Sequence, residues 1–204
     1  MALGFYFVNL VLQFFSRKVF LDHLGAEVLG LNTTATNLLQ FLNFAELGIG
    51  TAIACTLYKP LFDRDTVAIN EIVLLQGWMY RRIAWVVIAG AAVLMCFFPW
   101  IFEKMQLPLW YAYASFGALL VSALLSYFVN YKQIVLSADQ KEYRIQYSYK
   151  ASMLAKTLCQ IVAIKYFDDG YVWWLALEVG FAVVASVALN AVILFLFDVQ
   201  SWAI

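Results

Sequence analysis

The sequence predicts an all-α integral membrane protein, a bundle of six transmembrane helices. Of its 204 residues, 65% are hydrophobic and only 13% are charged, with a mean hydropathy of +0.81. A soluble domain of this size cannot bury so much apolar surface. Apolar runs also recur along the chain at lengths close to the roughly 20 residues that cross a bilayer core. We therefore expect one transmembrane domain, with no soluble domain in the connections.

Six apolar runs define the expected spans. The first starts with MALGFYFVNLVLQFF, without the basic leader of a cleavable signal peptide. Before the third, the segment from Asp63 to Arg82 alternates polar and apolar residues at helical spacing, which suggests a helix lying at the membrane interface. The last two runs are separated by FDDGY, a tight turn. The expected spans are residues 1–20, 30–57, 83–102, 109–130, 148–167 and 171–197.

Lysine and arginine residues predict the orientation, because cytoplasmic connections carry an excess of them. The connections after the second and fourth runs carry about twice as many as the opposite side. DHLGAE, EKMQLP and FDDGY are therefore expected outside, with both termini in the cytoplasm. The first side has Lys59, Arg64, Arg81, Arg82, Lys132, Lys141, Arg144 and Lys150, and the other has Arg17, Lys18, Lys104 and Lys165.

Charge, cysteine and histidine content narrow the function classes. The chain has 13 basic and 13 acidic residues, so no basic excess points to nucleic acid. The three cysteines lie in apolar runs without a CxxC pair, and His23 is the single histidine, so we expect no metal site. No catalytic constellation or phosphate-binding glycine loop is present, and we expect neither enzyme activity nor a cofactor.

The second run carries a stripe of polar residues. On a helix of about 100° per residue they fall within roughly one third of the circumference, so they are expected to face protein or water. A carboxylate near the middle of a membrane is costly unless it is paired, protonated or hydrated, and it often marks a functional site. The alternative is that the stripe hydrogen-bonds neighbouring helices. Its members are Asn32, Thr36, Gln40, Asn43, Glu46 and Gly50.

The fifth run contributes a second group of polar residues. Lys156, Thr157 and Gln160 share one helical face. An intramembrane lysine could meet an anionic ligand, pair with Glu46 or Glu178, or extend its ammonium to the interface. Glu178 and Asn190 lie on different parts of the sixth run, which implies no shared site.

Three segments resemble one family. The runs RKVFLDHLGAEVLGLN and LLQFLNFAELGIGTAIACTLYKPLFDRD, followed later by KQIVLSADQKEYR, are similar to the bacterial polysaccharide flippases that move O-antigen and capsule repeat units. This family belongs to the multidrug, oligosaccharidyl-lipid and polysaccharide exporter superfamily. The resemblance implies a six-helix lobe beside a central cavity in the bacterial inner membrane. It also implies alternating access and a lipid-pyrophosphate-linked oligosaccharide as the partner, with the polyprenyl tail in membrane lipid.

Family members have two such lobes, whereas this chain corresponds to the N-terminal one. We expect a truncated or split half, whose partner is a missing C-terminal lobe or a second half-subunit. The resemblance implies that Asn32, Gln40 and Asn43 bind sugar hydroxyls, and that Arg17 or Lys156 offsets pyrophosphate charge. Glu46 is the candidate for binding a coupling H⁺ or Na⁺. The cavity set comprises Arg17, Asn32, Thr36, Gln40, Asn43, Lys156 and Gln160. The alternatives are a drug or cation antiporter lobe, a membrane transferase and a structural membrane partner.

Overall fold

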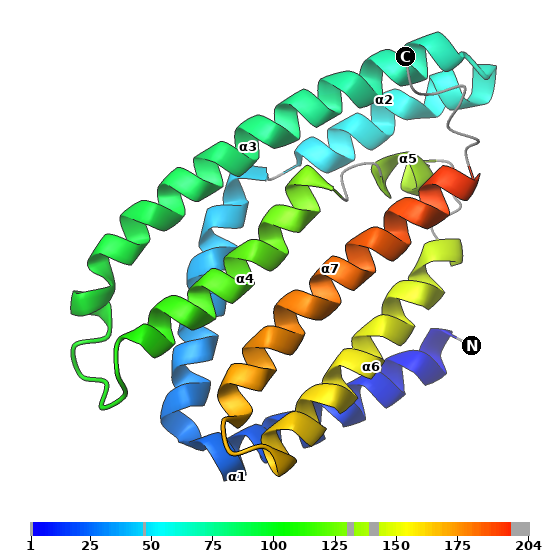
Figure 1. The fold of residues 1–204 in the computed structure, drawn as a ribbon. Coiled ribbons are helices and arrows are strands. Elements are labelled where there is room, and N and C mark those ends of the chain that lie inside the picture. Colours follow the sequence, from blue (N-terminus) through cyan, green and yellow to red (C-terminus); the bar gives the residue numbers. More distant parts are fainter. Residues whose placement is uncertain (1, 47, 130–132, 139–142, 197–204) are drawn as a thin grey trace.

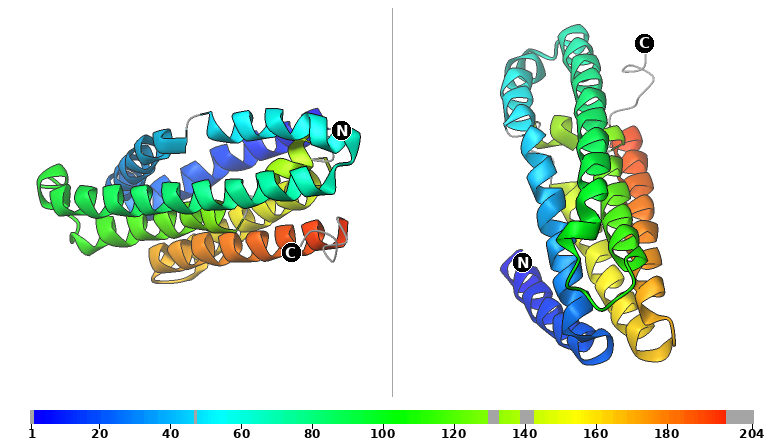
Figure 2. Two further views of the ribbon diagram at one scale, coloured as in Figure 1. Left: turned by 90° about the horizontal axis from the view of Figure 1, so that it is seen from above. Right: turned by 90° about the vertical axis from the view of Figure 1, so that its left-hand side faces the viewer.

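The computed structural model describes residues 2–46, 48–129, 133–138 and 143–196, and within them every regular element is a helix. The long helices form an elongated bundle (Figures 1 and 2). The elements are α1 (Ala2–Asn43), the 3₁₀ helix η1 (Phe44–Glu46), α2 (Ile49–Asp63), α3 (Thr66–Ile101), α4 (Trp110–Phe128), α5 (Gln133–Ala138), α6 (Tyr143–Tyr166) and α7 (Gly170–Leu196).

Three of the described helices are long and apolar enough to cross a membrane, judged by length and composition. They are α3, α4 and residues Gly170–Ala191 of α7. Much of their apolar surface points outward, as on α3, where Trp85 is 65% and Val86 59% exposed. Such exposure suits contact with lipid and would be unfavourable in water. The expected spans 1–20, 30–57 and 148–167 have no counterpart among these three helices.

Helix α1 is two helical arms joined by a sharp bend. The bend is at Gly25, whose φ of 85° and ψ of 166° belong to a region that only glycine occupies readily. The first arm lies along α6, and the second rises beside α3 and α4 (Figure 1). Near the bend, Phe20 packs edge-to-face on Trp174 of α7, with ring centroids 5.5 Å apart. The expected connection DHLGAE is therefore a bend of one residue.

The predicted uninterrupted helix over residues 30–57 is wrong. Helix α1 ends at Asn43, η1 follows, and α2 begins at Ile49 in a new direction (Figure 1). Gly48, the residue before α2, has a left-handed backbone with φ 82°, which glycine adopts without a steric penalty. The helical wheel therefore holds for the stripe only as far as Asn43, and Glu46 is oriented by η1.

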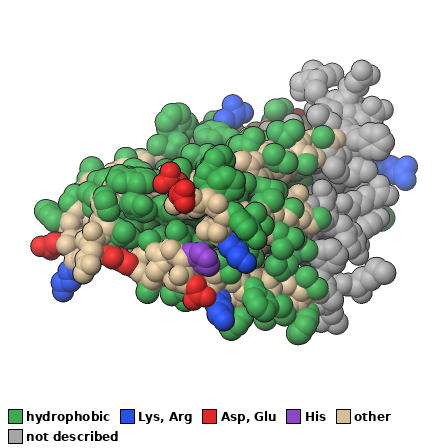
Figure 3. Space-filling model, turned by 60° about the horizontal axis from the view of Figure 1, so that its bottom comes forward, with side chains coloured by type: hydrophobic (Ala, Val, Ile, Leu, Met, Phe, Trp, Pro, Cys, Tyr) green, Lys and Arg blue, Asp and Glu red, His purple; other side chains and the backbone are tan. Residues whose placement is uncertain are grey.

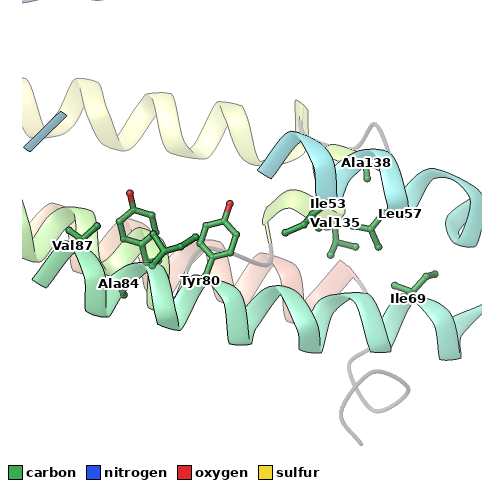
Figure 4. Close-up of a cluster of buried hydrophobic side chains, with 10 residues drawn as sticks. Ile53, Leu57, Ile69, Tyr80, Ala84, Val87, Val135 and Ala138 are labelled. Carbon is green, nitrogen blue, oxygen red and sulfur yellow. The ribbon is translucent and has the colours of Figure 1, made fainter. Parts of the chain in front are cut away.

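The segment before residue 83, predicted as a helix at the membrane interface, is helical and is continuous with the span that follows it. Helix α3 runs without a break from Thr66 to Ile101, about 54 Å at 1.5 Å per residue. Its N-terminus is capped by Asp65, whose carboxylate accepts hydrogen bonds from the backbone N–H groups of Val67 and Ala68, both at 3.1 Å. Its first turns pack against α2 (Figure 4).

Three clusters of buried side chains hold the helices together. One joins α2, α3, α4 and α5, with Leu57 fully buried at its centre (Figure 4). A second packs the rising arm of α1 against α3 and α4 around Phe98 and Phe116, both fully buried. The third packs the α1 bend against α4, α6 and α7. The rising arm thus belongs to two clusters.

Three connections meet at one end of the bundle: the α1 bend, the α3–α4 connection and the α6–α7 turn (Figure 1). The Gln106 backbone N–H donates to the Glu27 carboxylate and ties the first two together. Figure 3 brings this end forward and shows acidic and basic side chains on an otherwise largely hydrophobic described surface. The segments DHLGAE, EKMQLP and FDDGY therefore lie at the same end, which agrees with their predicted placement on one side.

Candidate functional site

The first polar cluster lies where α1 gives way to α2. The Tyr80 hydroxyl of α3 donates to Glu46 Oε1 at 2.7 Å, and the Tyr127 hydroxyl of α4 donates to Asn43 Oδ1 at 3.0 Å. The two tyrosine rings lie side by side, with centroids 6.0 Å apart. Gly50 leaves room for this approach, because a Cβ there would lie 3.1 Å from the Tyr80 hydroxyl oxygen. Two long helices therefore anchor the polar side chains of the break.

An open hollow of about 370 Å³ lies beside this break. It offers the carboxylate of Glu46 together with the side-chain oxygens of Gln40, Asn43 and Thr51. Such an arrangement can bind a proton or a small cation. The lining residues are Gln40, Asn43, Phe44, Glu46, Gly48, Gly50 and Thr51.

The depth of this cluster differs from the expectation of a mid-membrane carboxylate. Tyr127 is the penultimate residue of α4, a candidate span of 19 residues. That length is about 28 Å, close to the roughly 30 Å of a hydrocarbon core. Because Asn43 bonds Tyr127 and Glu46 bonds the neighbouring Tyr80, Glu46 lies level with the end of α4.

A second polar cluster joins α6 to α7. Lys156 Nζ donates to Glu178 Oε1 at 2.8 Å, and Gln160 Nε2 donates to the other carboxylate oxygen at 2.9 Å. The Gln160 amide also reaches the Trp174 carbonyl at 3.4 Å. Lys156 and Gln160 are four residues apart, so they project from one face of α6 toward the same carboxylate. Of the predicted alternatives for Lys156, the structure shows pairing with Glu178.

This ion pair lies well inside the bundle. Glu178 is eight residues from the start of α7, about 12 Å along a candidate span of 22 residues. The side chains of Lys156 and Glu178 are 24% and 14% exposed, and Gln160 is 4% exposed. Both oxygens of the carboxylate have a donor, as a charge in an apolar setting requires. The carboxylate placed deep along a candidate span is therefore Glu178.

A hollow of about 360 Å³ opens beside the ion pair, between α4, α5, α6 and α7. Its described wall mixes hydroxyl, amide and charged groups with small and apolar side chains. The polar members are Ser122, Ser126, Gln133, Ser152, Lys156, Glu178 and Ser186, and the others are Met153, Phe181, Ala182 and Ala185.

The remaining predicted site residues lie outside these two clusters. Arg17 is exposed on the first arm of α1, whereas the helix break follows the second arm. The Thr36 hydroxyl donates to the Asn32 carbonyl of its own helix at 2.8 Å. The side-chain Oδ1 of Asn32 is buried and accepts no hydrogen bond from the described residues. The structure thus brings together Gln40, Asn43 and Glu46 at one site, and it places Lys156 and Gln160 at another.

Sequence reasoning missed several members of both clusters. Neither Tyr80 nor Tyr127 was among the predicted site residues. Glu178 was considered only as one partner for Lys156. Asn190 donates to the carbonyl of Ser186 four residues earlier, so it has a local role. The available signal was the carboxylate itself, because an acidic residue in an apolar run demands a donor from another helix.

Both clusters place charged and hydrogen-bonding side chains beside a hollow, so they can bind polar ligands. Within the described part of the chain, no group of three or more His, Cys, Asp and Glu could hold a metal ion. The three cysteines are unpaired and exposed. Comparison of the chain with protein-family models, curated proteins and solved structures finds no match.

Proposed function

We propose that this chain is one lobe of a bacterial inner-membrane transporter that translocates lipid-pyrophosphate-linked oligosaccharides for polysaccharide biosynthesis. The sequence resemblance to polysaccharide flippases supports the proposal, as do the membrane-spanning character of α3, α4 and α7 and the polar clusters between helices. The lobe works with a second lobe, which supplies the facing wall of the pathway. The polyprenyl tail of the substrate remains in lipid while the sugars cross through polar surroundings.

The observation that carries the proposal is the polar hollow beside Lys156 and Glu178. A helix bundle held in lipid by packing alone has no need of a polar cavity with a charged pair at this depth. The Lys156–Glu178 pair joins only α6 and α7, yet hydroxyl groups from α4, and the Gln133 amide of α5, face the same space. Polar groups from four helices therefore converge on one cavity, as a substrate pathway requires.

Glu46 is the proposed site of coupling to H⁺ or Na⁺. It lies in the open hollow at the helix break, where a cation has access, and its carboxylate has one described donor, Tyr80. Loss or gain of a proton there changes the hydrogen bond that ties the break to α3. Such a change alters the contact between α1, α2 and α3, so ion binding at Glu46 can change how these helices are positioned.

The test separates a functional ion pair from structural packing. Replacing both partners, Lys156→Met with Glu178→Leu, removes the charges without leaving one of them unpaired, so folding should survive. Repeat-unit translocation is measured in cells that lack their own flippase, with a C-terminal lobe supplied and protein amounts matched. We expect the double variant to accumulate normally and to lose translocation.

The control is Lys165→Met, which removes a lysine of the same helix at an exposed position near its C-terminal end. This variant should translocate at the wild-type rate. Wild-type translocation by the double variant would instead identify the pair as packing and would remove the main support for the proposal.

A further inference from the structure

We propose that the hollow between α4, α5, α6 and α7 binds a neutral, hydroxyl-rich sugar ring, and that it does not bind the pyrophosphate group. The inference rests on the proposed function, because it assigns one part of a lipid-linked oligosaccharide to one cavity. It also changes the role of Lys156 from the anion contact implied by sequence resemblance to a positioning and hydrogen-bonding group.

The first argument is the charge of the site. Lys156 Nζ is 2.8 Å from Glu178 Oε1, so the ammonium and the carboxylate neutralise each other within the cavity wall. A pyrophosphate placed against Lys156 would also lie against Glu178, and like charges repel strongly where the side chains are mostly buried. Gln160 holds the second carboxylate oxygen and keeps Glu178 in place. The site therefore disfavours a multiply charged anion.

The second argument is the balance of donors and acceptors. The Ser122 hydroxyl donates to the Ala118 carbonyl of its own helix at 3.1 Å and can still accept, whereas a serine hydroxyl without such a bond can both donate and accept. Lys156 has N–H donors beyond the one that Glu178 receives. The hydroxyls come from three helices: Ser122 and Ser126 from α4, Ser152 from α6 and Ser186 from α7. Neighbouring sugar hydroxyls also act as donors and acceptors together. The wall thus matches the hydrogen-bonding pattern of a sugar more closely than that of an acceptor-only phosphate.

The third argument is the apolar part of the wall and the size of the space. Phe181, Met153, Ala182 and Ala185 line the same hollow, and the C–H faces of a sugar ring pack on such surfaces. The volume of about 360 Å³ is at the lower end of the roughly 300–1,000 Å³ of small-molecule sites. The hollow therefore suits one or two rings of a longer glycan, with the rest of the substrate elsewhere in the pathway.

The binding test uses the full chain in lipid nanodiscs, with methyl N-acetylglucosaminide and inorganic pyrophosphate as probes in ligand-observed NMR. Ser126→Ala should weaken glycoside binding by about fivefold, the effect of one lost hydrogen bond. Ala185→Leu places a larger side chain in the hollow and should weaken it roughly tenfold. The matched control is Val184→Leu, on the same helix at a position 59% exposed, and it should bind like the wild type.

Pyrophosphate at equal concentration should not displace the glycoside. Displacement by pyrophosphate that is lost in Lys156→Met would identify an anion site and overturn the inference. No detectable glycoside binding by the wild-type chain would overturn it as well, and so would equal binding by all three variants.

A second set of measurements distinguishes failure of this inference from failure of the proposed function. It also distinguishes binding of a free sugar from binding of a lipid-linked one. Polyprenyl pyrophosphate carrying the same sugar should compete with the glycoside, while polyprenyl pyrophosphate alone should not. The glycoside could bind while the lipid-linked sugar does not compete and the two-lobe assembly does not translocate. That result would support the sugar site and refute the flippase proposal. Normal translocation by Ala185→Leu, combined with lost glycoside binding, would leave the flippase proposal standing and refute the assignment of this hollow to the glycan of the transported substrate.

Discussion

Replacing Gly25 with alanine tests how the bend of α1 is held. Gly25 has φ 85° and ψ 166°, and no heavy atom lies within 4 Å of the place where a Cβ would be added. The substitution therefore creates no clash, and its whole effect is backbone strain of about 1–3 kcal/mol. We expect Gly25→Ala to destabilise the protein by that amount, since the bend packs the two arms of α1 against different helices.

The matched control for this substitution is Gly30→Ala. Gly30 is also in α1, has an ordinary helical backbone and has no heavy atom within 4 Å of its added Cβ. Alanine is favoured over glycine in a helix interior by about 0.5–1 kcal/mol, so this variant should be more stable than the wild type. The same chemical change should thus act in opposite directions, with a difference of about 1.5–4 kcal/mol between the two variants.

Equilibrium unfolding in mixed micelles, with SDS as the denaturant and helix content followed by circular dichroism, measures both free energies of unfolding. If Gly25→Ala is as stable as Gly30→Ala, the positive φ at the bend is not required, and the argument from backbone conformation fails. A loss of stability in both variants would point to contacts of these two positions beyond those described.

The other predictions concern the helix break and the topology. Glu46→Gln keeps an acceptor for Tyr80 but cannot ionise, so the fold should remain while translocation by the two-lobe assembly is lost; wild-type translocation would leave Glu46 as a packing group. Tyr80→Phe removes a hydrogen bond to a carboxylate and should lower the free energy of unfolding by about 1.5–3 kcal/mol in SDS titration, and an unchanged value would contradict that role. With the native cysteines replaced, Asp168→Cys should react with a membrane-impermeant thiol reagent in intact cells and Lys59→Cys should not, because these residues lie toward opposite ends of the bundle (Figure 1). The reverse labelling pattern would invert the predicted orientation.

Local properties of the sequence determined the helical membrane character of this protein. Hydropathy and helix propensity depend on residues close together in the chain, and both are strong in α3, α4 and α7. Polar and charged residues within apolar runs could be identified from the sequence for the same reason. Glu46, Asn43, Lys156 and Gln160 all have polar partners on other helices in the structure, as a polar group in an apolar setting requires.

Only the tertiary structure decided which partners these residues have and how deep they lie. Glu46 bonds a tyrosine 34 positions later, and Lys156 bonds a carboxylate 22 positions later. No helical period links residues so far apart, because the rotation and height of each helix are set by packing against its neighbours. The break between Asn43 and Ile49 was hidden for a related reason. An apolar run with one glycine pair predicts a continuous helix. Contacts with α3 and α4 fix the change of direction, which places Glu46 at the end of α4. The carboxylate in the interior of the bundle is then Glu178.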